Sequence, residues 1–142
     1  MEVRELMRQR PITVGMDEPV TAAAQLLRRY NLGALPVCDG AMRLRGMVTD
    51  RDIAVRCVAL GLDSAHTKVS EIMSRGIVTA EASDPVMSAA ATMKREQVRR
   101  LPVTEDGRLV GMVTLCDMAR RGAQDAEFAE LVRAISSNIV RR

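Results

Sequence analysis

Short apolar runs and one helical spacing follow a fixed order along the first half of the 142-residue chain. The β-branched run Ile12-Thr13-Val14 favours a strand. The helix predicted after it has Pro19 at its first turn and its apolar residues at i, i+3, i+4 and i+7: Ala23, Leu26, Leu27 and Tyr30. The elements expected next are a strand at Ala34–Cys38, a turn at Asp39-Gly40, a strand at Leu44–Val48 and a helix that begins at Thr49.

The second half of the chain predicts the same order of elements. These are a strand at residues 77–79, a helix opened by Pro85, a strand around Leu101, a turn at Asp106-Gly107, a strand at Leu109–Val113 and a helix that begins at Thr114. The apolar side of the helix after Pro85 is weaker than in the first copy, because it consists of Ala89, Ala90 and Met93.

Four sequence blocks recur in the same order, which excludes coincidence and indicates an internal repeat. Val3-Arg-Glu-Leu-Met7 returns as Val69-Ser-Glu-Ile-Met73, 66 residues later. The other pairs are Glu18-Pro-Val with Asp84-Pro-Val, Leu35-Pro-Val with Leu101-Pro-Val, and Gly46-Met-Val-Thr with Gly111-Met-Val-Thr. We expect a first repeat at residues 1–60, a linker at 61–67, a second repeat at 68–122 and a C-terminal segment at 123–142.

Each repeat predicts a strand-helix-strand-strand-helix unit of the α/β (α+β) class, too small to bury both faces of its own sheet. We therefore expect the two pseudo-symmetric units to pack together through their sheets. The C-terminal segment predicts a further amphipathic helix, whose apolar residues are Phe128, Leu131, Val132, Ile135 and Ile139. This helix either docks on its own module or forms a homodimer contact, because soluble monomers rarely expose an apolar stripe.

The composition indicates a globular protein, with 47% hydrophobic and 27% charged residues. The net charge of +3 suits an anionic small molecule but is too small to indicate a nucleic-acid partner. Tyr30 and Phe128 are the only aromatic residues, so the stacking platforms that single-strand binders use are missing. We expect no nucleic-acid binding.

The cysteines favour neither a disulfide framework nor a metal site. Cys38, Cys57 and Cys116 are an odd number without a Cys-x-x-Cys spacing, and His66 is the only histidine. We expect reduced, mostly buried thiols and no metal. The N-terminus carries acids and no apolar run, and no stretch approaches the roughly 18 apolar residues of a membrane span, so we expect a cytoplasmic protein.

The motif Thr-x-x-Asp occurs twice at a predicted strand-to-helix junction, as Thr49–Asp52 and Thr114–Asp117. One interpretation is a pair of capping boxes, in which hydroxyl and carboxylate satisfy the free N–H groups of a helix start. The other is a ribose-phosphate site. A helix start and a threonine hydroxyl suit phosphate, and an ionised aspartate accepts hydrogen bonds from a ribose diol.

Leu-Pro-Val followed by Gly-Met-Val-Thr-x-x-Asp, with an Asp/Glu-Pro helix start before it, resembles the CBS (cystathionine-beta-synthase-type) motif, here in tandem. The resemblance covers about Val3 to Arg121. It implies one module with two clefts for AMP, ADP, ATP or S-adenosylmethionine. It also implies a homodimer, since stand-alone modules of this family usually pair into a flat disc.

The resemblance also implies two groups of site residues. One cleft would use Thr114 and Asp117, with Ile12, Thr13 and Ala34 around the base. The other would use Thr49 and Asp52, with Val78, Thr79 and Arg100. Arg99-Arg100 stand where the first copy has Gly33-Ala34 and are either a solvated basic pair or a cationic fork that binds phosphate. Arg51 could also bind phosphate, although the neighbouring Asp50 would repel it. The two clefts are therefore expected to be unequal.

We expect a non-catalytic regulatory module that binds an adenine nucleotide as its ligand, requires no cofactor and acts on an unidentified target protein. No constellation supports an enzyme, since His66 has no nucleophile to activate and Asp52 and Asp117 stand in separate copies. The alternative is a ligand-free structural or protein-interaction module whose Thr-x-x-Asp motifs only cap helices.

Overall fold

The computed structural model describes residues 1–122 and 126–138. The chain forms two compact units, which we name after the aspartate of their motif. The Asp52 unit is Ile12–Ile77, and the Asp117 unit combines Met1–Pro11 with Val78–Arg142. No helix in the described ranges has the length and apolar character that crossing a bilayer requires.

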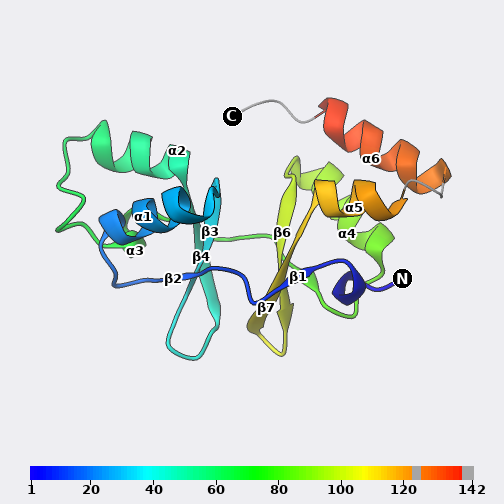
Figure 1. Cartoon of the computed structure of the whole chain (residues 1–142), viewed down its shortest axis with the longest axis horizontal. Coiled ribbons are helices and arrows are strands. Elements are labelled where there is room, and N and C mark those ends of the chain that lie inside the picture. The colour runs from blue at the N-terminus through cyan, green and yellow to red at the C-terminus, as the bar shows by residue number, and fades with distance from the viewer. Residues whose placement is uncertain (123–125, 139–142) are drawn as a thin grey trace. The chain divides into compact units, whose positions relative to one another are not determined.

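The Asp52 unit contains one three-stranded sheet in the order β2-β3-β4, with β2 parallel and β4 antiparallel to β3. Its elements are β2 (Val14–Gly15), α1 (Val20–Tyr30), β3 (Ala34–Cys38), β4 (Leu44–Thr49), α2 (Asp50–Ile53), the π-helical η2 (Ala54–Val58) and α3 (Val69–Ile72). The predicted strand-helix-strand-strand-helix order is confirmed (Figure 1).

The Asp117 unit repeats this order and adds a strand and a helix. Its elements are η1 (Val3–Glu5), β1 (Arg8–Gln9), β5 (Ala80–Glu81), α4 (Val86–Glu96), β6 (Arg100–Glu105), β7 (Arg108–Thr114), α5 (Leu115–Gly122) and α6 (Ala126–Asn138). The sheet has the order β1-β7-β6-β5, with β1 antiparallel to β7 at its edge. The mixed α/β class is therefore confirmed in both units.

Three local predictions need correction. The first strand of each repeat lies later than its β-branched run, because only Val14–Gly15 and Ala80–Glu81 pair with the neighbouring buried strand. Pro19 and Pro85 occupy the position before the first helical residue, with extended ψ angles of 152° and 142°. Tyr30, the last residue of α1, is 44% exposed and lies outside the buried face of that helix.

The compact units do not coincide with the sequence repeats, because each repeat begins with a segment that joins the other sheet. In the Asp117 unit, β1 pairs with β7, so that Arg8 lies opposite Met112. In the Asp52 unit, Ser74 takes the equivalent place opposite Met47, with reciprocal backbone hydrogen bonds of 3.0 and 2.8 Å. The repeat boundaries at residues 60, 67 and 122 stay a prediction for the domains.

A glycine makes each of these close approaches possible. A Cβ on Gly111 would lie 2.6 Å from the sulfur of Met7 and 2.9 Å from the carbonyl oxygen of Arg8. A Cβ on Gly46 would lie 2.6 Å from the carbonyl oxygen of Ser74. In both repeats, the glycine of the Gly-Met-Val-Thr block therefore allows the first segment of the other repeat to pack against the strand that ends in the threonine.

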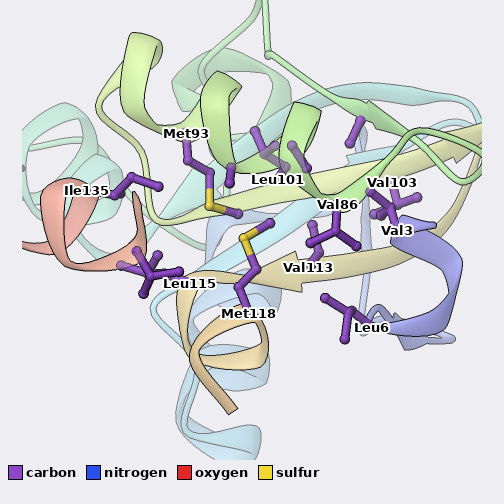
Figure 2. Close-up of a cluster of buried hydrophobic side chains, with 14 of the residues drawn as sticks. Val3, Leu6, Val86, Met93, Leu101, Val103, Val113, Leu115, Met118 and Ile135 are labelled. Carbon is purple, nitrogen blue, oxygen red and sulfur yellow. The ribbon is translucent and has the colours of Figure 1, made fainter. Parts of the chain in front are cut away.

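The core of the Asp117 unit lies between its sheet and its helices. Figure 2 shows Met93 of α4 and Met118 of α5 pointing toward each other, and both are fully buried. These two methionines therefore fill core space, as their flexible side chains suit them to do. The Asp52 unit has its own core, which includes Leu35, Val48 and the thiol-bearing Cys57.

The C-terminal helix α6 packs against α4 and α5 of its own unit (Figure 1). Phe128, Val132 and Ile135 are buried in the same core cluster, and Leu131 packs against it. Of the two interpretations of this helix, docking on its own module is therefore confirmed. The premise that the stripe would lie exposed on a single chain is wrong for these residues, and Ile139 lies outside the described residues.

Candidate functional site

The Thr114–Asp117 motif lies where β7 ends and α5 begins. The backbone N–H of Thr114 donates to Asp117 Oδ2 over 3.0 Å, and the N–H of Asp117 donates to Thr114 Oγ1 over 3.1 Å. Asp117 is only 8% exposed. The two side chains thus form a reciprocal cap that satisfies free N–H groups of the helix start.

The Thr49–Asp52 motif has the same geometry at the junction of β4 and α2. Both reciprocal hydrogen bonds measure 3.0 Å, and Asp52 is 9% exposed. The capping interpretation is therefore confirmed in both copies. Each cap engages only one oxygen of the carboxylate, so the other oxygen can still accept hydrogen bonds.

The second carboxylate oxygen of each aspartate faces arginine. Asp117 Oδ1 lies 3.4 Å from Arg8 Nε and 4.0 Å from a guanidinium nitrogen of Arg120. Asp52 Oδ1 lies 3.8 Å from Arg56 Nε. The three arginine side chains are 51–68% exposed, so these contacts are weak and solvent-screened. They leave Oδ1 able to accept further hydrogen bonds.

Arg99 and Arg100 flank the start of α5. The N–H of Leu115 donates to the carbonyl oxygen of Arg99 over 2.8 Å, and Arg100 pairs with Thr114 across β6 and β7. Both arginines are exposed. The structure therefore brings the basic pair beside the threonine of its own unit.

The equivalent positions in the Asp52 unit carry no charge. The carbonyl oxygen of Gly33 accepts from the N–H of Asp50 over 3.1 Å, and Ala34 pairs with Thr49. Arg51 is exposed, and its N–H donates to the carboxylate of Asp50 over 2.8 Å. An acid thus stands at the first helical residue here, where α5 has a leucine.

The remaining predicted site residues lie directly before the first strand of each unit. Ile12 and Thr13 precede β2 and are half-buried, as Val78 and Thr79 are before β5. Each predicted group combines a Thr–Asp pair of one unit with residues of the other. The grouping of Thr114 and Asp117 with Ile12, Thr13 and Ala34, and of Thr49 and Asp52 with Val78, Thr79 and Arg100, stays a prediction.

Sequence reasoning missed the arginines that face the two carboxylates. Arg120 and Arg56 stand three and four residues after their aspartates, a helical spacing that could have indicated the pairs. Arg8 lies 109 residues from Asp117 along the chain. Its strand is only two residues long, too short to show a hydrophobic pattern in the sequence. Arg8 comes close to Asp117 only because the first segment of each repeat joins the sheet of the other repeat.

The donor groups of the described residues do not assemble into a metal centre. Cys38 and Cys57 are buried and Cys116 is exposed, so the prediction of buried thiols is confirmed for two of three. His66 is exposed and its Nδ1 lies 2.6 Å from Asp63, a hydrogen bond that lowers the pKa of that carboxyl group. Within residues 1–122 and 126–138, no three His, Cys, Asp or Glu side chains gather as metal ligands.

Comparison with known proteins identifies a relative that matches nearly the whole chain. Hypoxic response protein 1 of Mycobacterium tuberculosis is 40% identical over 134 residues, which are 94% of this chain and 93% of the relative. The segments Thr21–Gln25, Gly33–Cys38 and Val48–Asp52 resemble parts of this relative and predict the likeness from the sequence. Its crystal structure, which has two coordinated zinc ions, covers 84% of this chain and 98% of its own with a TM-score of 0.79.

Two further solved structures carry ligands. The CBS domain pair of protein MJ0100, in complex with 5′-methylthioadenosine and S-adenosyl-L-methionine, is 30% identical with a TM-score of 0.74 and covers 87% of this chain and 97% of its own. CBSX2 in complex with AMP is 27% identical with a TM-score of 0.75 and covers 87% and 96%. The family model for the CBS domain matches twice, at residues 3–58 and 69–123. With both Thr-x-x-Asp motifs at equivalent strand-to-helix junctions, the chain belongs to the CBS domain family as a tandem pair.

Proposed function

We propose that this chain is a non-catalytic regulatory module that binds an adenosyl compound at its two Thr–Asp helix starts. The observation that carries the proposal is the repeated geometry of these starts: one carboxylate oxygen caps the helix and the other faces exposed arginine. The MJ0100 pair and CBSX2, which share the fold, bind adenosyl ligands. One oxygen of each carboxylate is held in a cap, which favours binding over acid–base chemistry.

Each group has a distinct role in this proposal. The hydroxyl oxygen of Thr114 accepts the N–H of Asp117, so its proton can donate to a phosphate oxygen. Asp117 Oδ1 accepts from the ribose diol, as Asp52 Oδ1 does in the other unit. Arg99 and Arg100, whose backbone lies beside Leu115 and Thr114, are proposed for a phosphate chain at this start, which replaces the predicted grouping of Arg100 with Thr49 and Asp52. The residues proposed to surround the base are Ile12, Thr13, Ala34, Val78 and Thr79.

Calorimetric and thermal titrations with adenosine, AMP, ATP and S-adenosylmethionine test the proposal. A ligand at a hundredfold excess over its Kd should stabilise the fold by about 2.7 kcal/mol. Asp117→Asn separates cap from site, because the amide oxygen still accepts the N–H of Thr114 while the amide nitrogen cannot accept from a diol. We expect this variant to keep most of its stability and to lose binding at its helix start, and Asp52→Asn to do the same in the other unit.

Cys116 offers a local readout of the same site. It is exposed and stands between Thr114 and Asp117, whereas Cys38 and Cys57 are buried and serve as internal controls. A nucleotide bound at this helix start should slow the alkylation of Cys116, measured by mass spectrometry of the modified peptide. Unchanged alkylation at a saturating ligand concentration would contradict binding there.

The second candidate function is a ligand-free structural or protein-interaction module. The complete capping boxes favour it, because they explain both Thr-x-x-Asp motifs without a ligand. Mass-spectrometric inspection of the purified protein for co-purified nucleotide separates the two candidates. Alanine at Asp52 and Asp117 would then lower the melting temperature and leave nucleotide titrations as flat as those of the wild type.

A further inference from the structure

Arg8 is brought to the Asp117 helix start by a segment that belongs to the other repeat. β1 lies beside β7 in Figure 1, and Arg8 pairs with Met112, two residues before Thr114. The segment is held by the buried side chains of Val3 and Leu6. The side chain of Arg8 remains 65% exposed while its Nε contacts Asp117 Oδ1 at 3.4 Å. It is thus fixed at its base and accessible at its tip.

Positively charged residues outnumber negatively charged ones around this helix start. Two arginines contact the carboxylate of Asp117, Arg8 on β1 and Arg120 on α5. The backbone of two more, Arg99 and Arg100, lies beside Leu115 and Thr114 at the same helix start. The first two residues of α5, Leu115 and Cys116, are uncharged. The site therefore has a surplus of cationic donors.

The Asp52 helix start lacks this surplus. It has two acids, Asp50 and Asp52, and two arginines beside them: the backbone N–H of Arg51 donates to Asp50, and Arg56 Nε lies 3.8 Å from Asp52 Oδ1. The positions equivalent to the other arginines carry neutral residues: Ser74 opposite Met47, Gly33 beside Asp50 and Ala34 beside Thr49. The two starts thus share the Thr–Asp pair and differ in charge.

We propose that the two helix starts select ligands by charge. The Asp117 start takes an adenosyl ligand with a phosphate chain, and Arg8 is one of its ligand-binding residues. The Asp52 start takes an adenosyl ligand without phosphates. This inference rests on the proposed function. When a ribose diol donates to Asp117 Oδ1, it replaces the long contact with Arg8, whose planar donor fork then binds phosphate oxygens with the neighbouring arginines.

Calorimetric titration of the full chain with adenosine, AMP, ATP and inorganic tripolyphosphate tests this selection. We expect ATP to bind the Asp117 start at least about tenfold more tightly than adenosine, and Arg8→Gln to weaken ATP binding about ten- to a hundredfold with little effect on adenosine. Arg10→Gln is the matched control, because it removes the same charge from the same segment. Melting curves of both variants establish that they fold.

Two readouts assign the effect to one helix start. ATP should protect Cys116 from alkylation in the wild type and lose this protection in Arg8→Gln. In Asp117→Asn, the binding that remains belongs to the Asp52 start and should show no preference for ATP over adenosine. A preference that persists unchanged in Asp117→Asn would overturn the assignment of phosphate selection to the Asp117 start.

The remaining outcomes separate this inference from the proposed function. If adenosine and ATP bind the wild type equally, or Arg8→Gln weakens both equally, selection by charge is wrong while adenosyl binding stands. If tripolyphosphate binds and adenosine does not, the anion site stands and adenosyl binding is wrong. If none of these compounds binds, both selection by charge and adenosyl binding are wrong.

Discussion

At the scale of single residues, Thr114 and Asp117 satisfy two demands with one geometry. Each gives one polar atom to the cap of α5, and each keeps a further donor or acceptor for other partners. The spacing Thr-x-x-Asp therefore predicts a cap and a ligand site equally well. Sequence alone could place these residues at the helix start but could not decide between the two roles.

Gly111→Ala tests the close approach of β1 to β7. A Cβ at this position would lie 2.6 Å from the sulfur of Met7 and 2.9 Å from the backbone oxygen of Arg8, so the strands must separate. We expect a loss of about 1–3 kcal/mol in the free energy of unfolding, measured by urea denaturation. Gly40→Ala is the control, because no heavy atom lies within 4 Å of its added Cβ. Equal stability of both variants would contradict the close approach.

The buried thiol of Cys38 gives a pH dependence. Burial raises its pKa from the ordinary 9.0 to about 11, and the charge of Asp39 acts in the same direction. Because the folded pKa is raised, the contribution of the neutral thiol to stability is complete below about pH 9 and is lost as pH rises through about 11.

Between these pH values the wild type should therefore lose about 2 kcal/mol more unfolding free energy than Cys38→Ala. Urea denaturation at a series of pH values measures this difference, and Cys116→Ala, at an exposed position, is the control. Parallel pH profiles of the wild type and Cys38→Ala would refute the assignment.

At the scale of elements, the sequence predicted most of the repeated unit. The strand Ala34–Cys38 has the expected bounds, and the helices expected at Thr49 and Thr114 begin one residue later, because apolar runs and the capping motif are local signals. η1, β1 and α3 were not predicted. They are two to four residues long and depend on contacts with distant strands, so they leave no periodic pattern. Arg8 was missed for the same reason.

The docking of α6 can be tested at Ile135. Its side chain is fully buried in the core of the Asp117 unit. Ile135→Ala should lower the free energy of unfolding by about 2–5 kcal/mol, the usual cost of removing a buried branched side chain. Ser136→Ala, at the exposed neighbouring position, should change it little. Equal stability of the two variants in thermal denaturation would mean that α6 is not docked.

At the scale of the whole molecule, the buried stripe of α6 changes the reasoning about self-association. Phe128, Val132 and Ile135 are covered by their own unit, so they no longer call for a partner. The apolar side chains that stay exposed include a run at the end of the second helix of the Asp52 unit: Val55, Val58, Leu60 and Leu62, with exposed fractions of 46%, 66%, 69% and 44%. A second copy that covers this run would remove it from water.

We therefore predict a homodimer with an isologous contact, the commonest closed arrangement, through residues 55–62. Light scattering at micromolar concentration should report about twice the chain mass of 15.6 kDa. The double variant Val58→Glu with Leu60→Glu should be monomeric, because the contact would bury two unpaired charges. Met87→Glu is the control, since it adds a charge at an exposed apolar position of the Asp117 unit.

Deletion of residues 126–142 separates the two parts of this prediction. A helix that only covers its own unit should leave a dimer of lowered thermal stability, since the surface at residues 55–62 is intact. Conversion of this deletion variant to monomers would show that the C-terminal helix bridges the subunits after all. A monomeric wild type would end the homodimer hypothesis.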